Sequence, residues 1–136
     1  MDGQHAKKDV LSVTLILEGA DGSLHGRVNY DDNLIIETAR TVEELQTKMK
    51  QLLFEFHEVD QNSVVFKLEY DLTAFFEDFN FLKITKIAEL SGLNGSLMRQ
   101  YATGKKFPSA KQVEKIAGAV RTLANQLNNV HFYAKA

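Results

Sequence analysis

Cysteine is absent from the 136-residue sequence, which excludes disulfide bonds and thiolate metal sites. No apolar run is long enough to cross a membrane, and the start MDGQHAKKD lacks the apolar core of a signal peptide. The sequence also lacks a P-loop, a G-x-G-x-x-G fingerprint, an H-E-x-x-H pair and a nucleophile elbow. We therefore expect a cytoplasmic protein that is not an enzyme and has no catalytic residues, metal ion or cofactor.

Charge is divided unevenly along the chain, although the formal net charge is only −2. The stretch from Phe81 to the end holds nine basic and two acidic residues, a net +7. The preceding stretch holds seven basic and sixteen acidic residues, a net −9. Binding to nucleic-acid phosphates requires concentrated positive charge, so the carboxy-terminal part is the candidate for that role. The acidic part is expected to face protein or water.

A tight turn joins two short helices in the basic part, within ITKIAELSGLNGSLMRQYATG. Gly92 follows the apolar positions of the first helix and can take the left-handed conformation that ends a helix. Asn94 is expected to cap the second helix. One side of that second helix is apolar, with Leu97, Met98 and Tyr101 at helical spacing, and must be buried. The opposite side therefore faces outward.

The outward side of the second helix is polar and has no acidic residue: Ser96, Arg99, Gln100 and Thr103 recur at i, i+3, i+4 and i+7. Arginine favours guanine and glutamine favours adenine in the DNA major groove, so this stripe can read base edges. Lys105 and Lys106 follow this helix, at the place where a DNA backbone would pass. The alternative is that these side chains form only a solvated helix surface.

This tract resembles the helix-turn-helix of the Cro and xenobiotic-response-element repressor families, which implies sequence-specific DNA binding by a lambda-repressor-like helical domain. The family pattern is matched by Ala88, Gly92, Met98, Tyr101, Gly104, Lys105, Lys106 and Pro108. The family often has glutamine at two positions where this chain has Ile84 or Thr85, and Gly95. The resulting DNA-binding candidates are Thr85, Gly95, Ser96, Arg99, Gln100, Thr103, Lys105 and Lys106.

Alternating apolar residues predict strands at residues 11–17, 24–30, 34–38 and 64–70, the first two joined by a hairpin turn at Asp21 and Gly22. Thr41 and Glu44 form a T-x-x-E capping box, which predicts an amphipathic helix before the fourth strand. A short helix capped by Asp71 then leads into the basic part. The sequence thus predicts an α+β protein, with a small β-β-β-α-β sheet domain at residues 1–70 and an all-helical DNA-binding domain at residues 71–136.

The first domain, the capped start TVEEL and the run FKLEYDLTAFFEDFNFL resemble the HicB-like antitoxins. That resemblance implies a reduced ribonuclease-H-like sheet that covers a small toxin protein, with a second domain that represses the shared operon. A glycine-rich stretch typical of the family is replaced by residues 37–40. Two alternatives stay open: a toxin-neutralising, protein-binding module without specific DNA binding, and a metal-dependent nuclease. The candidate carboxylates for the nuclease lie in turns, strand ends or cap positions: Asp31, Asp32, Glu37, Glu69 and Asp71.

The last helix, residues 110–127, begins with an S-x-x-Q capping box formed by Ser109 and Gln112. Its apolar stripe is wider than a short helix-turn-helix requires, so part of it could contact a second copy. Helix-turn-helix proteins bind DNA mostly as dimers, which predicts a homodimeric repressor on double-stranded DNA. The alternative is that the stripe packs within one chain, against Phe75, Phe76, Phe79, Phe81 and Leu82.

Overall fold

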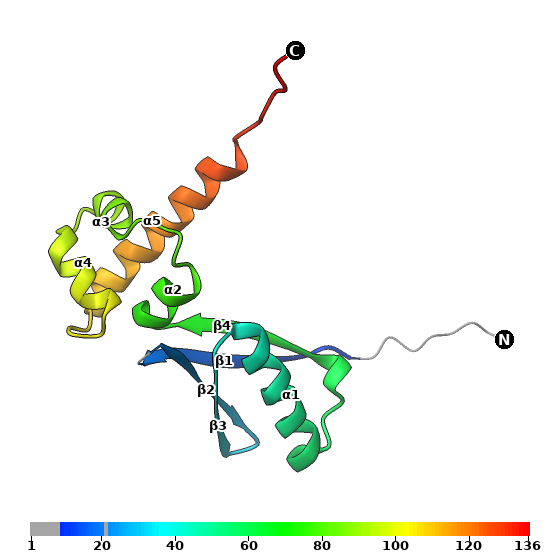
Figure 1. Ribbon diagram of the computed structural model, residues 1–136. Helices are drawn as coiled ribbons and strands as arrows, with labels where there is room; N and C mark the ends of the chain where they lie inside the picture. Colours follow the sequence, from blue (N-terminus) through cyan, green and yellow to red (C-terminus); the bar gives the residue numbers. More distant parts are fainter. Residues whose placement is uncertain (1–8, 21) are drawn as a thin grey trace. The chain divides into compact units, whose positions relative to one another are not determined.

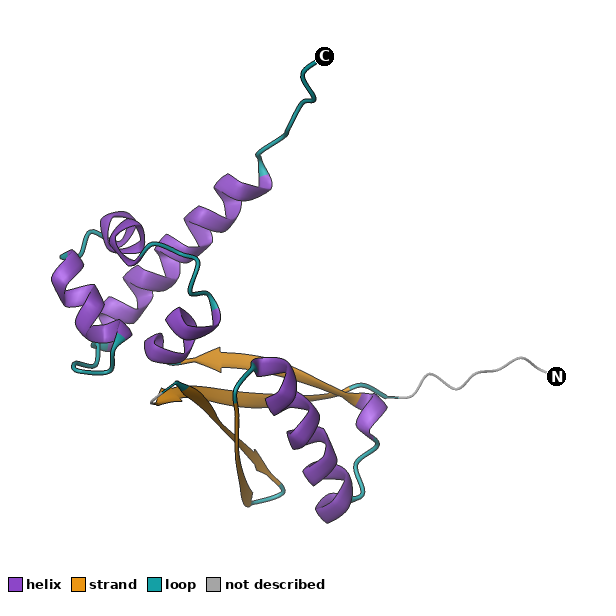
Figure 2. Cartoon of the chain, viewed as in Figure 1, coloured by secondary structure: helices purple, strands orange, loops and turns teal. Residues whose placement is uncertain are grey.

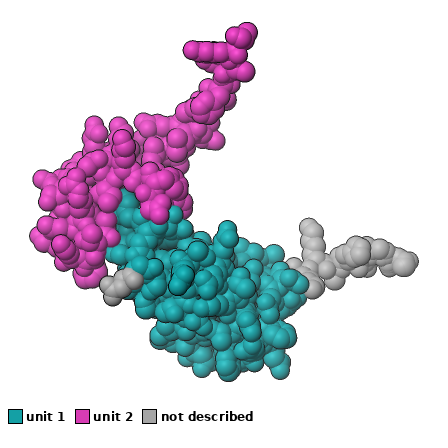
Figure 3. All heavy atoms as spheres, viewed as in Figure 1, with its two compact units in different colours: residues 1–78 teal, residues 79–136 magenta. Residues whose placement is uncertain are grey.

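The protein is α+β, with a four-stranded mixed sheet and five α-helices in a computed structural model that describes residues 9–20 and 22–136. The chain divides into two compact units, unit 1 at Met1–Asp78 and unit 2 at Phe79–Ala136 (Figure 3). The sequence placed the boundary at residue 70. The division after Asp78 follows from the packing of a short helix on the sheet of unit 1.

The sheet of unit 1 has the strand order β3-β2-β1-β4 (Figures 1 and 2). The first three strands form an antiparallel meander, and the fourth lies parallel to the first, with Leu68 opposite Leu15. The elements of the unit are β1 (Leu11–Ala20), β2 (Ser23–Tyr30), β3 (Asn33–Ala39), α1 (Val42–His57), the 3-10 turn η1 (Gln61–Ser63), β4 (Val64–Tyr70) and α2 (Leu72–Asp78).

Helix α1 packs on one face of the sheet, and the core lies between them. The side chains of Leu15, Leu17, Leu45, Met49 and Leu53 are fully buried there. The close approach of α1 depends on Gly26 of β2, because a Cβ at this position would lie 2.6 Å from the Cδ2 atom of Leu45. Glycine at this position therefore leaves room for the Leu45 side chain of α1 to pack directly on the backbone of β2.

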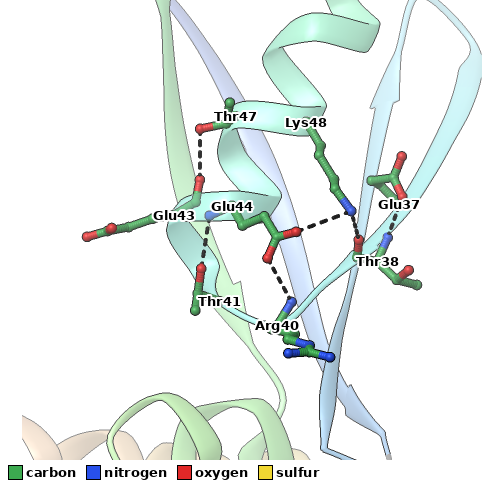
Figure 4. Close-up of polar contacts among 8 residues, drawn as sticks. All are labelled: Glu37, Thr38, Arg40, Thr41, Glu43, Glu44, Thr47 and Lys48. Carbon is green, nitrogen blue, oxygen red and sulfur yellow. Dashed lines mark hydrogen bonds and ion pairs between the residues drawn. The ribbon is translucent and has the colours of Figure 1, made fainter.

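The start of α1 carries half of the predicted capping box. The Thr41 side chain accepts a hydrogen bond from the Glu44 N–H at 3.1 Å, as the sequence predicts. The Glu44 carboxylate, however, accepts from the N–H of Arg40 at 3.3 Å rather than from that of Thr41 (Figure 4). The Glu44 side chain therefore binds the N–H of the residue before the N-cap, and not that of the N-cap itself.

Helix α2 belongs to the sheet domain because Asp71 ties it to β1. One carboxylate oxygen of Asp71 accepts from the N–H of Ala74 at 2.8 Å and from that of Gly19 at 3.2 Å. A Cβ on Gly19 would lie only 2.8 Å from the backbone nitrogen of Ala74, so glycine makes this contact possible. The sequence predicted the cap at Asp71 but assigned the helix to the DNA-binding domain.

Tyr70, at the end of β4, reaches the far end of the same helix. Its hydroxyl donates a hydrogen bond to the carboxylate of Asp78 at 2.8 Å. Burial, and then this hydrogen bond, raise the pKa of the Tyr70 hydroxyl well above its ordinary value. The tyrosine therefore keeps its proton, and its hydrogen bond to α2, at a higher pH than an exposed tyrosine would.

The turns of the meander use the left-handed region of the backbone. Asp31 and Asp32 have φ angles of 51° and 61°, which is the pattern of a two-residue type I′ hairpin between paired Tyr30 and Asn33. In the first hairpin Gly22 has a φ of 78°, and Asp21 lies outside the described residues. The sequence predicted the turn between β1 and β2 from its Asp-Gly pair.

Unit 2 consists of α3 (Ile84–Ser91), α4 (Gly95–Ala102) and α5 (Ala110–Asn128). Helix α3 packs against both α4 and α5, and the three helices share a small core. Its buried side chains are those of Ile87, Ala88, Met98, Tyr101, Ile116 and Ala119. None of the helices in the described residues is at once long and apolar enough to span a membrane.

The apolar stripe of α5 is only partly buried. Ile116 and Ala119 are 3% exposed, whereas Val113 and Leu127 are 46% and 61% exposed. After the helix, Val130, Phe132 and Tyr133 also remain exposed. Helix α5 and the residues after it thus present apolar side chains that the described residues leave uncovered.

Candidate nucleic-acid interface

The turn between α3 and α4 has the conformation that the sequence predicts. Gly92 takes the left-handed conformation with a φ of 69°, and the N–H of Leu93 donates to the carbonyl of Ala88 at 2.9 Å. Asn94 then caps α4, because its side-chain oxygen accepts from the N–H of Ser96 at 2.7 Å. These two caps fix the direction in which α4 leaves α3.

The inner side of α4 is anchored by a buried side chain and a polar contact. Met98 is fully buried, and Tyr101 is 4% exposed with its hydroxyl donating to the side-chain oxygen of Gln112 on α5. Ser109 caps α5 by accepting from the N–H of Gln112 at 3.3 Å. The glutamine side chain therefore holds α4 against α5, and it does not complete the capping box that the sequence predicted.

The outer side of α4 presents Ser96, Arg99 and Thr103 to solvent. Within the described residues of unit 2, no carboxylate forms an ion pair with Arg99; the ion pair in this unit joins Lys86 to Glu89. The Thr103 hydroxyl donates to the backbone carbonyl of Arg99 at 2.9 Å, which leaves only its lone pairs for another molecule. Arg99 is thus the strongest free hydrogen-bond donor on this surface.

Gln100 is placed differently from its neighbours. Its side-chain oxygen is buried and has no hydrogen-bond donor among the described residues, so it is not directed outward in this conformation. Its backbone carbonyl accepts from the N–H groups of Lys105 and Lys106, at 2.9 Å and 3.2 Å. Gln100 therefore anchors the basic loop to the end of α4, a role that helical spacing alone could not reveal.

The basic loop after α4 is compact and exposed. Gly104, with a φ of 78°, turns the chain, and the side chains of Lys105 and Lys106 are exposed beside it. Phe107 is 82% exposed next to these lysines, a position that the sequence reading overlooked. The sequence could have indicated Phe107 as a nucleic-acid contact, because it is an aromatic residue inside a basic loop. Such a ring can contact a sugar or base beside the phosphates that lysines bind.

Thr85 and Gly95 lie together at the amino-terminal end of α4. Thr85 is exposed, and a Cβ on Gly95 would lie 3.8 Å from the Cγ2 atom of Thr85. The structure therefore brings these two predicted positions to the same end of the helix. Neither side chain offers the long amide group that glutamine would supply there.

Substituting Gly95 with alanine should stabilise unit 2 by about 0.4 to 1 kcal/mol, because the added methyl group meets only an ordinary contact and restricts the unfolded chain. Urea unfolding followed by circular dichroism measures the change. Gly92→Ala is the control: its left-handed backbone should make the same substitution destabilising. A loss of stability in Gly95→Ala would contradict the packing described at this helix end.

No family model matches this chain, and the same is true of curated proteins and solved structures. In the described part of the chain, no group of three His, Cys, Asp or Glu side chains is arranged to hold a metal ion. The candidate interface consequently rests on its own geometry.

Proposed function

We propose that the protein is a sequence-specific DNA-binding transcriptional repressor, and that unit 2 is a helix-turn-helix domain of lambda-repressor-like type. The observation that carries this proposal is an exposed cationic surface. Arg99 lies on α4, which begins after a tight turn and is capped by Asn94, and Lys105 and Lys106 follow that helix. The cationic groups of this surface have no carboxylate partners within the described part of unit 2. Such a surface can meet a polyanion without first breaking internal ion pairs.

In this mechanism α4 enters the major groove. The Arg99 guanidinium donates to the O6 and N7 atoms of a guanine, which is the commonest specific contact between proteins and DNA. Lys105 and Lys106 bind backbone phosphates beside the groove and orient the helix. A dimer places two copies of α4 about one DNA turn apart and blocks access to a promoter.

We also propose that unit 1 is a reduced ribonuclease-H-like sheet of the HicB-like antitoxin type. The order β-β-β-α-β and the net charge of −9 before unit 2 favour this assignment. An acidic surface would speed association with a small basic ribonuclease toxin and select it over other partners. The protein would then neutralise the toxin with one unit and repress their shared operon with the other.

Selection from a random duplex library tests the DNA-binding role. We expect recovered sequences to share a motif and to bind much more tightly than scrambled duplexes in fluorescence anisotropy at fixed salt. Absence of duplex binding even at low salt would favour the protein-binding alternative. Cleavage that requires a divalent metal and is lost in Asp31→Asn or Glu69→Gln would favour the nuclease alternative.

Replacing Lys105 with alanine should weaken binding to selected and scrambled duplexes by similar factors. Loss of one phosphate contact should reduce the slope of log affinity against log salt concentration by about 1. Lys135→Ala, in the carboxy-terminal tail, removes the same charge away from the loop and is the matched control. A change restricted to the selected duplex would contradict the assignment of Lys105 to the phosphates.

A further inference from the structure

Strand β3 is an edge of the sheet, because the described strands leave it paired only with β2. Exposed strand edges present unpaired N–H and C=O groups that can bind another strand. The direction of these groups on β3 follows from the turn before it. The two-residue hairpin makes Tyr30 and Asn33 a hydrogen-bonded pair, so the backbone groups of residues 33, 35 and 37 point toward β2. Those of Leu34, Ile36 and Thr38 point outward.

One end of this edge is closed by side chains (Figure 4). The N–H of Thr38 donates to the Glu37 carboxylate at 2.9 Å, and the Thr38 carbonyl accepts from the Lys48 ammonium group at 2.9 Å. Both outward groups of Thr38 are therefore occupied, which also supports the direction deduced from the turn. The other end of the strand terminates at the left-handed residues Asp31 and Asp32. The open edge is limited to Leu34 and Ile36.

Apolar side chains surround this open segment. Leu34 and Ile36 are each 61% exposed, and Phe56 near the end of α1 is 70% exposed. A cavity of about 520 Å³ lies between β3 and the end of α1, lined by residues 33–36 with Leu52, Phe56 and His57. Backbone groups available for pairing thus lie beside a hollow that can receive an apolar side chain.

We propose that a second copy of this chain binds here, through antiparallel pairing of the two β3 strands about a two-fold axis at Ile35. In that register Leu34 of each copy lies opposite Ile36 of the other, and four backbone hydrogen bonds form. Thr38 falls opposite Asp32 of the second copy, beyond the end of its strand. Thr38, whose outward backbone groups are occupied, therefore lies where pairing between two β3 strands would stop in any case. This agreement fits a strand that pairs with a second copy of itself.

Charge complementarity selects the same occupant. The antiparallel register places the acidic turn of one copy, Asp31 and Asp32, beside Arg40 at the end of β3 in the other copy. Lys48 at the same end is already paired with Glu44 of its own chain at 3.5 Å, so Arg40 is the cation that meets the turn. The two-fold axis repeats this contact, so each half of the interface brings the two carboxylates of the turn to the Arg40 guanidinium. Leu34, Ile36 and their symmetry mates form an apolar cluster between the two charged ends. This sheet interface is separate from α5 and does not depend on DNA binding.

A single cysteine at position 35 tests the register directly, since the chain contains no other cysteine. The two copies of residue 35 would form a non-hydrogen-bonded pair with Cα atoms about 4.5 Å apart, within the range for a disulfide. We expect oxidised Ile35→Cys to migrate without reductant at twice the 15.3 kDa of one chain. Val65→Cys, on the other edge strand and 54% exposed, is the control and should remain mostly monomeric.

Sedimentation of the full chain supplies the second test. Ile36→Lys changes an exposed side chain, so unit 1 should still fold, and the dissociation constant of the dimer should rise roughly tenfold or more. Val65→Lys should leave it unchanged. A wild-type monomer at high concentration would overturn the proposal. So would a dimer that survives Ile36→Lys and dissociates in Leu127→Lys, because the contact would then lie on α5. The selection from the random duplex library is repeated with Ile36→Lys and with Leu127→Lys, so that a loss of DNA binding is distinguished from a loss of the dimer.

Discussion

Replacing Met98 with alanine should lower the free energy of unfolding of unit 2 by about 2 to 5 kcal/mol. Met98 is fully buried on the inner side of α4, where the small core of the three helices offers few other large side chains. Its removal opens a cavity that so small a core cannot easily collapse to fill. Hydrogen exchange read by mass spectrometry should show faster exchange in α3, α4 and α5.

Two comparisons make this result interpretable. Met98→Leu keeps nearly the same volume and should cost less than about 1.5 kcal/mol. The amides of β1 and β2 in unit 1 provide an internal reference, and their exchange should stay unchanged. Equal acceleration of exchange in both units would contradict the division of the chain into two independently packed cores.

Replacing Arg99 with alanine should weaken binding to the selected duplex by about 1 to 3 kcal/mol, which corresponds to roughly 5-fold to 150-fold in affinity. The guanidinium is exposed on the outer side of α4 and has no ion-pair partner in the described residues of unit 2. It is therefore free to donate two parallel hydrogen bonds to guanine. The substitution should also relax the base preference at one position of the motif, as measured by repeating the selection.

Arg99→Lys separates charge from geometry at this position. Lysine keeps the positive charge but lacks the planar fork, so the variant should retain binding to scrambled duplexes and lose preference for the selected one. If Arg99→Ala weakens binding to both kinds of duplex equally, Arg99 contacts phosphate and does not read sequence.

Local signals made much of unit 2 predictable from sequence. Gly92 and Asn94 act within a few residues of their own positions, and the structure confirms both caps. Thr41 caps α1 for the same reason. Local hydrogen bonds depend on residue type and short spacing, which a sequence displays directly.

Side chains that bond across elements were not predictable in the same way. The sequence indicated that Gln112 and Glu44 would complete their capping boxes, yet one holds Tyr101 and the other the N–H of Arg40. Gln100 fits the polar stripe by spacing, but its side-chain oxygen is buried. Each outcome depends on the distance to a neighbouring element, and periodicity carries no information about that distance.

Long-range packing also decided the boundary between the units. The sequence pattern places α2 after the last strand with no indication of what it packs against. Gly19, fifty-two residues before Asp71, permits the contact that binds α2 to β1. Pairing of β4 with β1 likewise joins segments far apart in the chain. Apolar alternation predicts that a segment is a strand, but it does not indicate which strand lies next to it.

The most direct test of the central claim is a double-mutant cycle between Arg99 and the guanine it is proposed to read. Anisotropy would compare wild type and Arg99→Ala on the selected duplex and on the same duplex with 7-deazaguanine, which lacks N7, at the specified base. We predict that the base change weakens wild-type binding and has little further effect on Arg99→Ala, so the two losses are coupled. Equal loss in both proteins at every guanine of the motif would contradict the assignment of Arg99 to a guanine base.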